Sequence, residues 1–251
     1  YVTLPDVRPL AKTNPTTTAF MELRAQEAAR KGKTLRHLQH WVPYNQISGN
    51  LKRAVLVAED DAFWQHEGVD IEQLKLSIQS DLEQGKGVRG GSTITQQLAK
   101  NLYLSPSRNP LRKLRELIIA RRLEAELTKT RIFEIYLNVI EWGDGIWGVD
   151  AAARAYFGTS AGSLSPDQAA LLAGAIINPR RYSPAHPNAR LLRRQRIIRA
   201  RMGGAEAPAT TEVRQATAAP AAPAPAAAAD DARSSLDEPD AESASDDTAE
   251  Q

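Results

Sequence analysis

The sequence predicts a mainly α-helical fold for residues 1–203. Apolar residues recur there at spacings of three and four, and stretches in which apolar and polar residues strictly alternate are few. Capping-box signals, in which a helix-starting residue is followed three positions later by Gln, precede two of the apolar runs. No internal repeat is visible.

The first predicted helix covers residues 18–31 and ends at Gly32. A segment containing Pro43 leads to a second helix over residues 47–58. Its apolar residues share one face, namely Ile47, Leu51, Ala54, Val55 and Ala58. This helix delivers Glu59 at its C-terminal end.

Asp70 and Gln73 predict the start of a third helix, which is interrupted by the glycines of residues 85–91. The same stretch contains Lys86 and Arg89, so we expect a cationic loop before the next helix.

Thr93 and Gln96 form the second capping box and start that next helix, and Pro106 and Pro110 bracket a turn after it. The later predicted helices cover residues 111–127, residues 131–140 after Thr130, and residues 148–157, 165–177 and 190–201. Between Trp142 and Trp147 we expect a loop formed by Gly143, Gly145 and Gly148.

Charge and composition change at residue 204. Residues 204–251 are mostly Ala, Pro, Ser, Thr and acid, and they hold 11 of the 30 acidic residues but 2 of the 32 basic ones. Such a composition buries too little apolar surface to offset the entropy of ordering, so we expect a disordered tail. Residues 1–203 then carry a net charge of +11, which suits nucleic acid, an anionic bilayer or a phosphate-bearing substrate.

The absence of cysteine excludes disulfides and thiolate chemistry. The longest apolar run, residues 169–177, is shorter than the roughly 20 residues that a membrane helix needs. Because the chain begins at Tyr1 and not at Met, we expect it to be a trimmed or internal segment of a longer protein.

Glu59 and Asp60 form a carboxylate pair that could supply a proton acceptor. Adjacent residues on a helix diverge by about 100°, so we expect one of the two to have a structural role. The alternative is a pair of solvated acids at a helix end. Phe63, His66 and Gly68 follow behind the pair.

Residues 90–97 concentrate glycines, hydroxyls and amides at a helix start, where backbone N–H groups favour a multiply charged anion. The polar side chains of this stretch are Ser92, Thr93, Thr95, Gln96 and Gln97. Lys100 lies seven residues after Thr93 and extends the polar patch along the same helix face. The alternative is simply a well-capped helix. With the carboxylate pair, this stretch suggests chemistry on a phosphorylated substrate.

Glu116 follows Arg112 by four residues and Lys113 by three. This spacing fits a surface ladder of ion pairs. It also fits a carboxylate that faces a cleft, with its basic neighbours keeping it ionised or holding a phosphate. Spacing leaves both open.

Five motifs in order give the chain a close resemblance to the peptidoglycan glycosyltransferases of family 51, of the monofunctional biosynthetic type. The resemblance extends over residues 17–184. The motifs are Glu59-Asp60 to Gly68; Gly90 to Gln97 with Lys100-Asn101; Arg112-Lys113 to Glu116; Tyr136-Leu137-Asn138 with Gly143; and Gly148-Val149 to Tyr156-Phe157-Gly158.

The resemblance implies a mainly α, lysozyme-like fold with two lobes and a substrate cleft, and an enzyme that polymerises lipid II. Glu59 is implied to be the general base that removes a proton from the acceptor GlcNAc 4-hydroxyl, while undecaprenyl pyrophosphate leaves the donor with inversion. Glu116 resembles the second catalytic carboxylate. The residues implied to bind substrate or pyrophosphate are Arg89, Ser92, Thr93, Gln96, Gln97, Lys100, Arg112 and Lys113. Those implied to support the site are Asp60, Phe63, His66, Gly68 and Asn138.

From the same resemblance we expect a membrane-proximal segment and helix over residues 1–40, a glycosyltransferase domain over 41–203 and the tail over 204–251. The implied partners are lipid II, the nascent glycan strand, the membrane and other wall-synthesis proteins, but no nucleic acid. We expect no required cofactor and assign no metal ligand firmly; Mg²⁺ or Mn²⁺ at the pyrophosphate is left open. The implied location is the periplasmic face of a bacterial inner membrane, with an N-terminal transmembrane anchor outside this chain.

Two other functions compete with this hypothesis. A lysozyme-like lytic muramidase would use two acids to cleave glycans, but it has no pyrophosphate to bind. A non-catalytic module, either a scaffold or a nucleic-acid binder, is disfavoured by the carboxylate pair and by the lack of a nucleic-acid motif. Transpeptidase chemistry is not expected, because Ser-x-x-Lys and Lys-Thr-Gly are missing.

Overall fold

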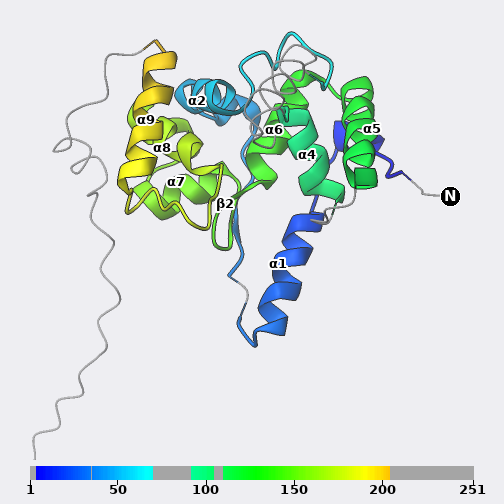
Figure 1. Ribbon diagram of the computed structural model, residues 1–251, viewed down its shortest axis with the longest axis horizontal. Coiled ribbons are helices and arrows are strands. Elements are labelled where there is room, and N and C mark those ends of the chain that lie inside the picture. The colour runs from blue at the N-terminus through cyan, green and yellow to red at the C-terminus, as the bar shows by residue number, and fades with distance from the viewer. Residues whose placement is uncertain (1–3, 35, 70–91, 105–109, 204–251) are drawn as a thin grey trace, which may run out of the picture. The chain divides into compact units, whose positions relative to one another are not determined.

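The computed structural model describes residues 4–34, 36–69, 92–104 and 110–203, and these ranges are mainly helical, as predicted. The helices are η1 (Arg8–Ala11), α1 (Ala19–Arg30), η2 (Tyr44–Gln46), α2 (Gly49–Glu59), α4 (Ile94–Tyr103), α5 (Pro110–Glu126), α6 (Lys129–Val139), α7 (Val149–Phe157), η3 (Ala161–Ser163), α8 (Pro166–Ala175) and α9 (Ala189–Arg201) (Figure 1). The helix predicted at Asp70, the cationic loop with Arg89, the turn from Pro106 and the tail lie outside the described residues.

The longer helices form two packed groups (Figure 1). In one group α2 packs on α8, and α9 covers α8, so the face of α2 with Leu51, Ala54 and Val55 is buried. In the other group α4 packs against α5, α6 and α1. Burial of these apolar faces at roughly 25 cal/mol per Å² is the main force that holds each group. Glu59 at the end of α2 and the first turn of α4 thereby come together.

A small sheet occupies the region where we predicted a glycine loop. Strands β2 (Glu141–Gly143) and β3 (Ile146–Trp147) form an antiparallel pair, and β1 (Leu38–Gln39) runs parallel to β3. The loop prediction is therefore corrected to a hairpin, because strands of two or three residues are too short to show alternation. Gly145 has a φ of +69°, and a Cβ there would lie 2.2 Å from the Arg36 carbonyl oxygen.

Asn138 joins α6 to the segment before η2. Its side chain is fully buried; its Oδ1 accepts from the Val42 N–H at 2.9 Å, and its Nδ2 donates to the Val42 and Glu134 carbonyls at 2.9 and 2.8 Å. Every polar atom of the amide thus has an internal partner, a pattern typical of a buried structural residue.

Two helix starts differ from prediction. Thr128, and not Thr130, caps α6, since its hydroxyl accepts from the Arg131 N–H. At α4 only half of the capping box forms, because Thr93 accepts from the Gln96 N–H whereas the Gln96 side chain binds elsewhere. Among the helices of the described residues, none has the length and apolarity to cross a bilayer.

Candidate active site

Glu59 ends α2 and contacts α4. Its Oε2 accepts a hydrogen bond from Gln97 Nε2 at 3.0 Å. Burial raises the pKa of Glu59 above its ordinary value of 4.5, and the Gln97 hydrogen bond and the charges of Arg194 and Lys100 only partly oppose this. A carboxyl group in this state can exchange a proton closer to neutral pH than a solvated glutamate can.

Gln97 is held on its other side by α6. The Tyr136 hydroxyl, whose residue is fully buried, donates to Gln97 Oε1 at 2.9 Å. Gln97 Nε2 also donates to the Ser92 carbonyl at 3.3 Å. Although the sequence placed Gln97 at a pyrophosphate, the structure directs its amide toward Glu59; a contact with substrate remains a prediction.

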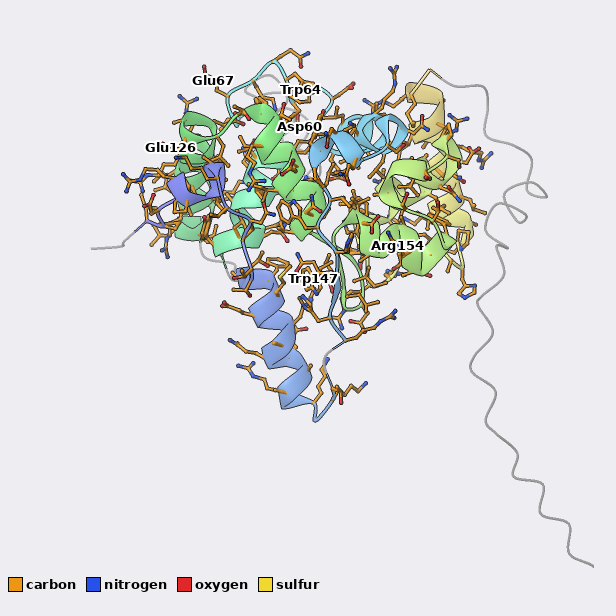
Figure 2. The ribbon with its side chains drawn as sticks, turned by 180° about the vertical axis from the view of Figure 1, so that it is seen from behind. Asp60, Trp64, Glu67, Glu126, Trp147 and Arg154 are labelled. Atoms are coloured by element: carbon orange, nitrogen blue, oxygen red, sulfur yellow. The ribbon has the colours of Figure 1, made fainter. Side chains whose placement is uncertain are left out.

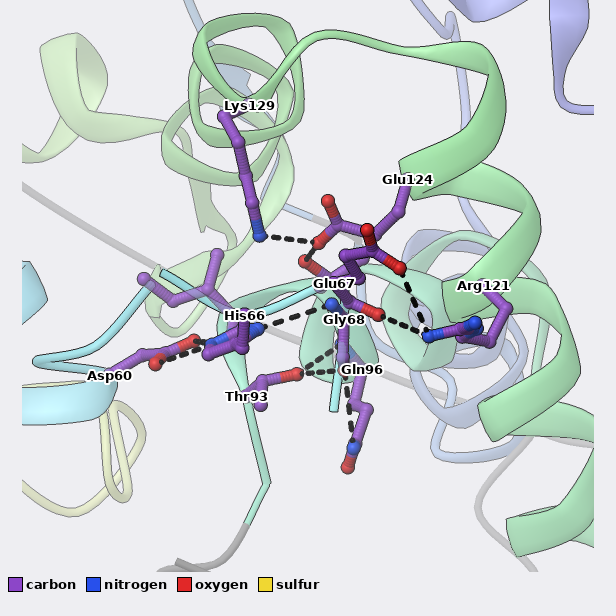
Figure 3. Close-up of polar contacts among 11 residues, drawn as sticks. Asp60, His66, Glu67, Gly68, Thr93, Gln96, Arg121, Glu124 and Lys129 are labelled. Carbon is purple, nitrogen blue, oxygen red and sulfur yellow. Dashed lines mark hydrogen bonds and ion pairs between the residues drawn. The ribbon is translucent and has the colours of Figure 1, made fainter. Parts of the chain in front are cut away.

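Asp60 binds the start of α4 and the His66 ring, and Figure 3 shows the contact with His66. It is 4% exposed, and its Oδ2 accepts from the Ile94 N–H at 2.8 Å. His66 Nε2 donates to Asp60 at 2.9 Å, because His66 Nδ1 already accepts from the Gly68 N–H at 3.1 Å and so carries no proton.

The expected anion site at the start of α4 is therefore partly filled by the protein itself. The Asp60 carboxylate takes the favourable position near the helix N-terminus, and Thr93 Oγ1 takes the Gln96 N–H. These amides cannot at the same time hold a pyrophosphate. Of the predicted anion ligands in the described residues, cationic side chains are left as the main candidates.

Thr93 and Gln96 fasten the loop that follows Asp60 (Figure 3). The Thr93 hydroxyl donates to the Gly68 carbonyl at 2.7 Å, and Gln96 Nε2 donates to the same oxygen at 3.3 Å. Gly68 has a φ of +82°, which a residue with a side chain adopts only with strain. The side chains of Thr93 and Gln96 are both buried, and their contact with substrate stays a prediction.

Phe63 anchors the middle of this loop. It is fully buried 5.5 Å from the Phe133 ring, and the Lys129 ammonium lies 4.4 Å from its ring centre. Lys129 in turn pairs with Glu124 at 2.8 Å. Trp64, labelled in Figure 2, lies on the same loop and is 43% exposed. Phe63 packing thus fixes the position of Asp60 and, with it, of Glu59.

Glu116 on α5 is 3% exposed, which decides against a surface ladder of ion pairs. Its Oε2 accepts from Arg112 Nη1 at 3.0 Å, and its Oε1 accepts from Lys113 Nζ. Lys113 Nζ also binds Ser92 Oγ at 3.2 Å and Gln96 Oε1 at 3.0 Å. Glu116 and its cations therefore face the first turn of α4.

Lys100 lies in the same charge field as both carboxylates. Burial lowers the pKa of its ammonium, and the charges of Glu116 and Glu59 oppose this shift, whereas those of Arg112 and Lys113 add to it. Gln97 contacts Glu59 and its neighbour Gln96 contacts Lys113, so the base candidate and the cations flank one turn of α4. Arg89, the remaining predicted anion ligand, lies outside the described residues.

The acids of the site do not fit a protein-held divalent cation. Both oxygens of Glu116 accept from cationic side chains, and in the part of the chain that the structure describes no three His, Asp or Glu side chains converge as a metal site. Mg²⁺ prefers several oxygen ligands, and positive neighbours repel it. A divalent cation held by the pyrophosphate itself stays a prediction.

Asp60→Asn is expected to lower stability by about 2 kcal/mol, because an NH2 donor replaces one carboxylate oxygen and then opposes either the Ile94 N–H or the His66 Nε2–H, and because the negative charge is lost. Turnover should fall far less than in a Glu59 variant. Thermal unfolding with activity measured on the same preparation checks this. An unchanged melting temperature would contradict the structural role, and a loss of turnover as deep as that of Glu59→Gln would show that Asp60 takes part in the chemistry.

Two contacts had no signal in the sequence. Tyr136 stands in one of the five motifs, but nothing in its neighbourhood along the chain indicated a contact with Gln97. Arg194 on α9 lies in a predicted helix to which no site residue was assigned, yet its Nε donates to the Gly174 carbonyl at 3.1 Å and its charge acts on Glu59. Both depend on packing between helices distant in sequence.

Comparisons with known proteins identify the family of the chain. The transglycosylase family model matches residues 26–203. A biosynthetic peptidoglycan transglycosylase of Nitrosomonas eutropha is 49% identical over 195 residues, which cover 78% of this chain and 80% of the relative. One of Methylobacillus flagellatus is 51% identical over 197 residues, covering 78% and 85%. These matches confirm the resemblance and the lysozyme-like, mainly α fold class. The chain belongs to the transglycosylase family.

Proposed function

We propose that this peptidoglycan transglycosylase polymerises lipid II, transferring the growing glycan from undecaprenyl pyrophosphate to the GlcNAc 4-hydroxyl of an acceptor lipid II. The observation that supports it best is the placement of Glu59 and of the cations around Glu116 on two sides of the first turn of α4. Glycosyl transfer from a pyrophosphate needs a base on one side and positive charge on the other.

On the acceptor side, Glu59 removes the proton of the 4-hydroxyl as its oxygen attacks the anomeric carbon of the donor MurNAc. The new bond joins that oxygen to the anomeric carbon, and the proton ends on the Glu59 carboxylate. A base is most effective when its pKa approaches the working pH, which burial of Glu59 favours. Attack opposite the leaving group converts the α linkage of the donor into a β linkage.

On the donor side, the bond from the anomeric carbon to the pyrophosphate oxygen breaks, and its electron pair stays with the pyrophosphate. Lys113, Lys100 and Arg112 stabilise this growing negative charge. Glu116 holds Lys113 and Arg112 in place, which gives the second carboxylate a positioning role. Ser92 Oγ, which accepts from Lys113, lies next to this group.

The substrate also sets where the reaction occurs. Lipid II is held in a bilayer by its undecaprenyl chain, so we place the enzyme at the periplasmic face of the inner membrane. The nascent glycan strand is its product and its second substrate. Other wall-synthesis proteins remain candidate partners.

A lytic muramidase is the competing function, since a glutamate with a raised pKa would also serve as a general acid. Supplying purified lipid II and, separately, finished glycan strands distinguishes the two. Transfer predicts polymer from lipid II and no shortening of the finished strands. Shortened strands without any polymer would overturn the proposal.

A further inference from the structure

Gln97 has two different kinds of neighbour at the two ends of its amide. Nε2 faces two acceptors, Glu59 Oε2 at 3.0 Å and the Ser92 carbonyl at 3.3 Å. Oε1 faces one donor, the Tyr136 hydroxyl at 2.9 Å. If the amide were flipped, its oxygen would face the Glu59 and Ser92 oxygens, and its NH2 group would face the Tyr136 hydroxyl, which would then have to accept. The observed orientation therefore makes the most hydrogen bonds.

Tyr136 is suited to hold this arrangement. Its ring is fully buried and packs 6.5 Å from the Phe133 ring in α6, so the hydroxyl has little freedom to move. Burial raises the pKa of Tyr136 well above its ordinary value, so the hydroxyl keeps its proton and stays a donor. Within the described residues, the Tyr136 hydroxyl makes one hydrogen bond, and its partner is Gln97.

We propose that Tyr136 is a positioning residue for the reaction: its hydroxyl holds the Gln97 amide so that Nε2 points at the Glu59 carboxylate. The inference rests on the proposed role of Glu59 as the base. Three helices contribute to this relay, with Tyr136 on α6, Gln97 on α4 and Glu59 on α2. The relay fixes both the direction of the carboxylate and its affinity for a proton.

Removing the hydroxyl leaves Gln97 Oε1 without a donor, and the amide then turns toward another donor or admits water. Its hydrogen bond to ionised Glu59 weakens, so protonated Glu59 is favoured. Other charges facing Glu59 are unchanged, namely Arg194 from α9, Lys100 from α4 and Asp60 beside it. Loss of the Tyr136 hydroxyl should therefore move the acid limb of the rate profile to higher pH.

The test is the pH dependence of kcat at saturating lipid II for Tyr136→Phe, which keeps the buried ring. We expect its acid limb to move up by about half a unit, with turnover at neutral pH reduced about three- to tenfold. Gln97→Met should move the limb in the same direction by at least as much. The double variant should match Gln97→Met alone, because the Tyr136 hydroxyl acts on Glu59 only through Gln97.

Tyr156→Phe is the matched control, because it removes a tyrosine hydroxyl that donates to the Trp142 carbonyl at 3.1 Å, outside the relay. Its acid limb should coincide with that of the wild type. If Tyr136→Phe fails to fold, 3-fluorotyrosine at position 136 keeps the hydroxyl, strengthens its donation and should move the limb to lower pH.

An acid limb of Tyr136→Phe that matches the wild type, or shifts of Tyr136→Phe and Gln97→Met that add, would overturn the relay. With 3-fluorotyrosine at position 136, an acid limb that stays in place or moves to higher pH would also overturn the relay. Failure of the proposed function gives a different result: wild-type protein would then make no polymer, or Glu59→Gln would retain turnover.

Discussion

Glu59→Gln is expected to reduce lipid II polymerisation about a thousandfold and to change lipid II affinity less than about threefold. Gln cannot take the acceptor proton, but it keeps the size of the side chain and an oxygen for the Gln97 hydrogen bond. Turnover and binding should be measured on the same preparations. Loss of binding equal to the loss of turnover would make Glu59 a ligand of the substrate and not its base.

The same substitution should increase stability at neutral pH. Because burial raises the pKa of Glu59 above 4.5, its stabilising contribution is present below pH 4.5 and is lost as the pH rises through the raised value. At pH 7 the burial of this acid therefore lowers the stability of the wild type, and Gln removes that cost. The difference in the free energy of unfolding between the two proteins should shrink as the pH falls to about 4.

Glu67→Gln is the control for this pair of measurements. Glu67 lies on the loop after Asp60, its side chain is 84% exposed, and its ion pair with Arg121 is long, at 3.5 Å. Turnover and stability of this variant should both match the wild type. If Glu67→Gln gained as much stability as Glu59→Gln, the gain would come from the loss of a negative charge in general and not from the burial of Glu59.

Lys113→Met is expected to reduce kcat about a hundredfold, because Lys113 is the cation that joins Glu116 to Ser92 and Gln96. Removing it takes away positive charge at the donor pyrophosphate. Its side chain is 45% exposed, but the buried Glu116 loses one of its two cationic partners, so the melting temperature should fall as well. Steady-state kinetics with lipid II, together with thermal unfolding, checks both expectations.

Lys52→Met is the matched control. Lys52 is also partly exposed and donates to one backbone carbonyl, that of Tyr44, at 3.2 Å, away from both carboxylates. It should keep wild-type turnover. If Lys113→Met turns over like Lys52→Met, the cations of α5 do not act on the leaving group.

The sequence predicted helices better than the contacts between them. Apolar spacing over residues 47–58 placed Glu59 at a helix end. The 100° divergence of neighbours predicted that one acid of the pair is structural, and the contacts of Asp60 with Ile94 and His66 support this. Both inferences need only the local periodicity of a helix. The hairpin at Glu141 gave no such pattern, since its strands are too short.

The partners of each site residue could not be predicted from spacing. Spacing left Glu116 open between a surface ladder and a cleft, and only its burial against α4 decided the matter. The start of α4 was expected to bind a substrate anion, and Asp60, more than thirty residues earlier, accepts from one of its N–H groups, that of Ile94. Such contacts depend on which helix ends meet, and that is fixed by the packing of the whole core.

Whether Glu59 removes the acceptor proton is tested most directly by the pH dependence of kcat at saturating lipid II, compared between wild type and Glu59→Asp. We predict an acid limb above pH 4.5 in the wild type, and a limb at lower pH in Glu59→Asp, since aspartate is the stronger acid. A limb that stays at the same pH in Glu59→Asp would belong to another group, such as the pyrophosphate, and would contradict the assignment of Glu59 as the base.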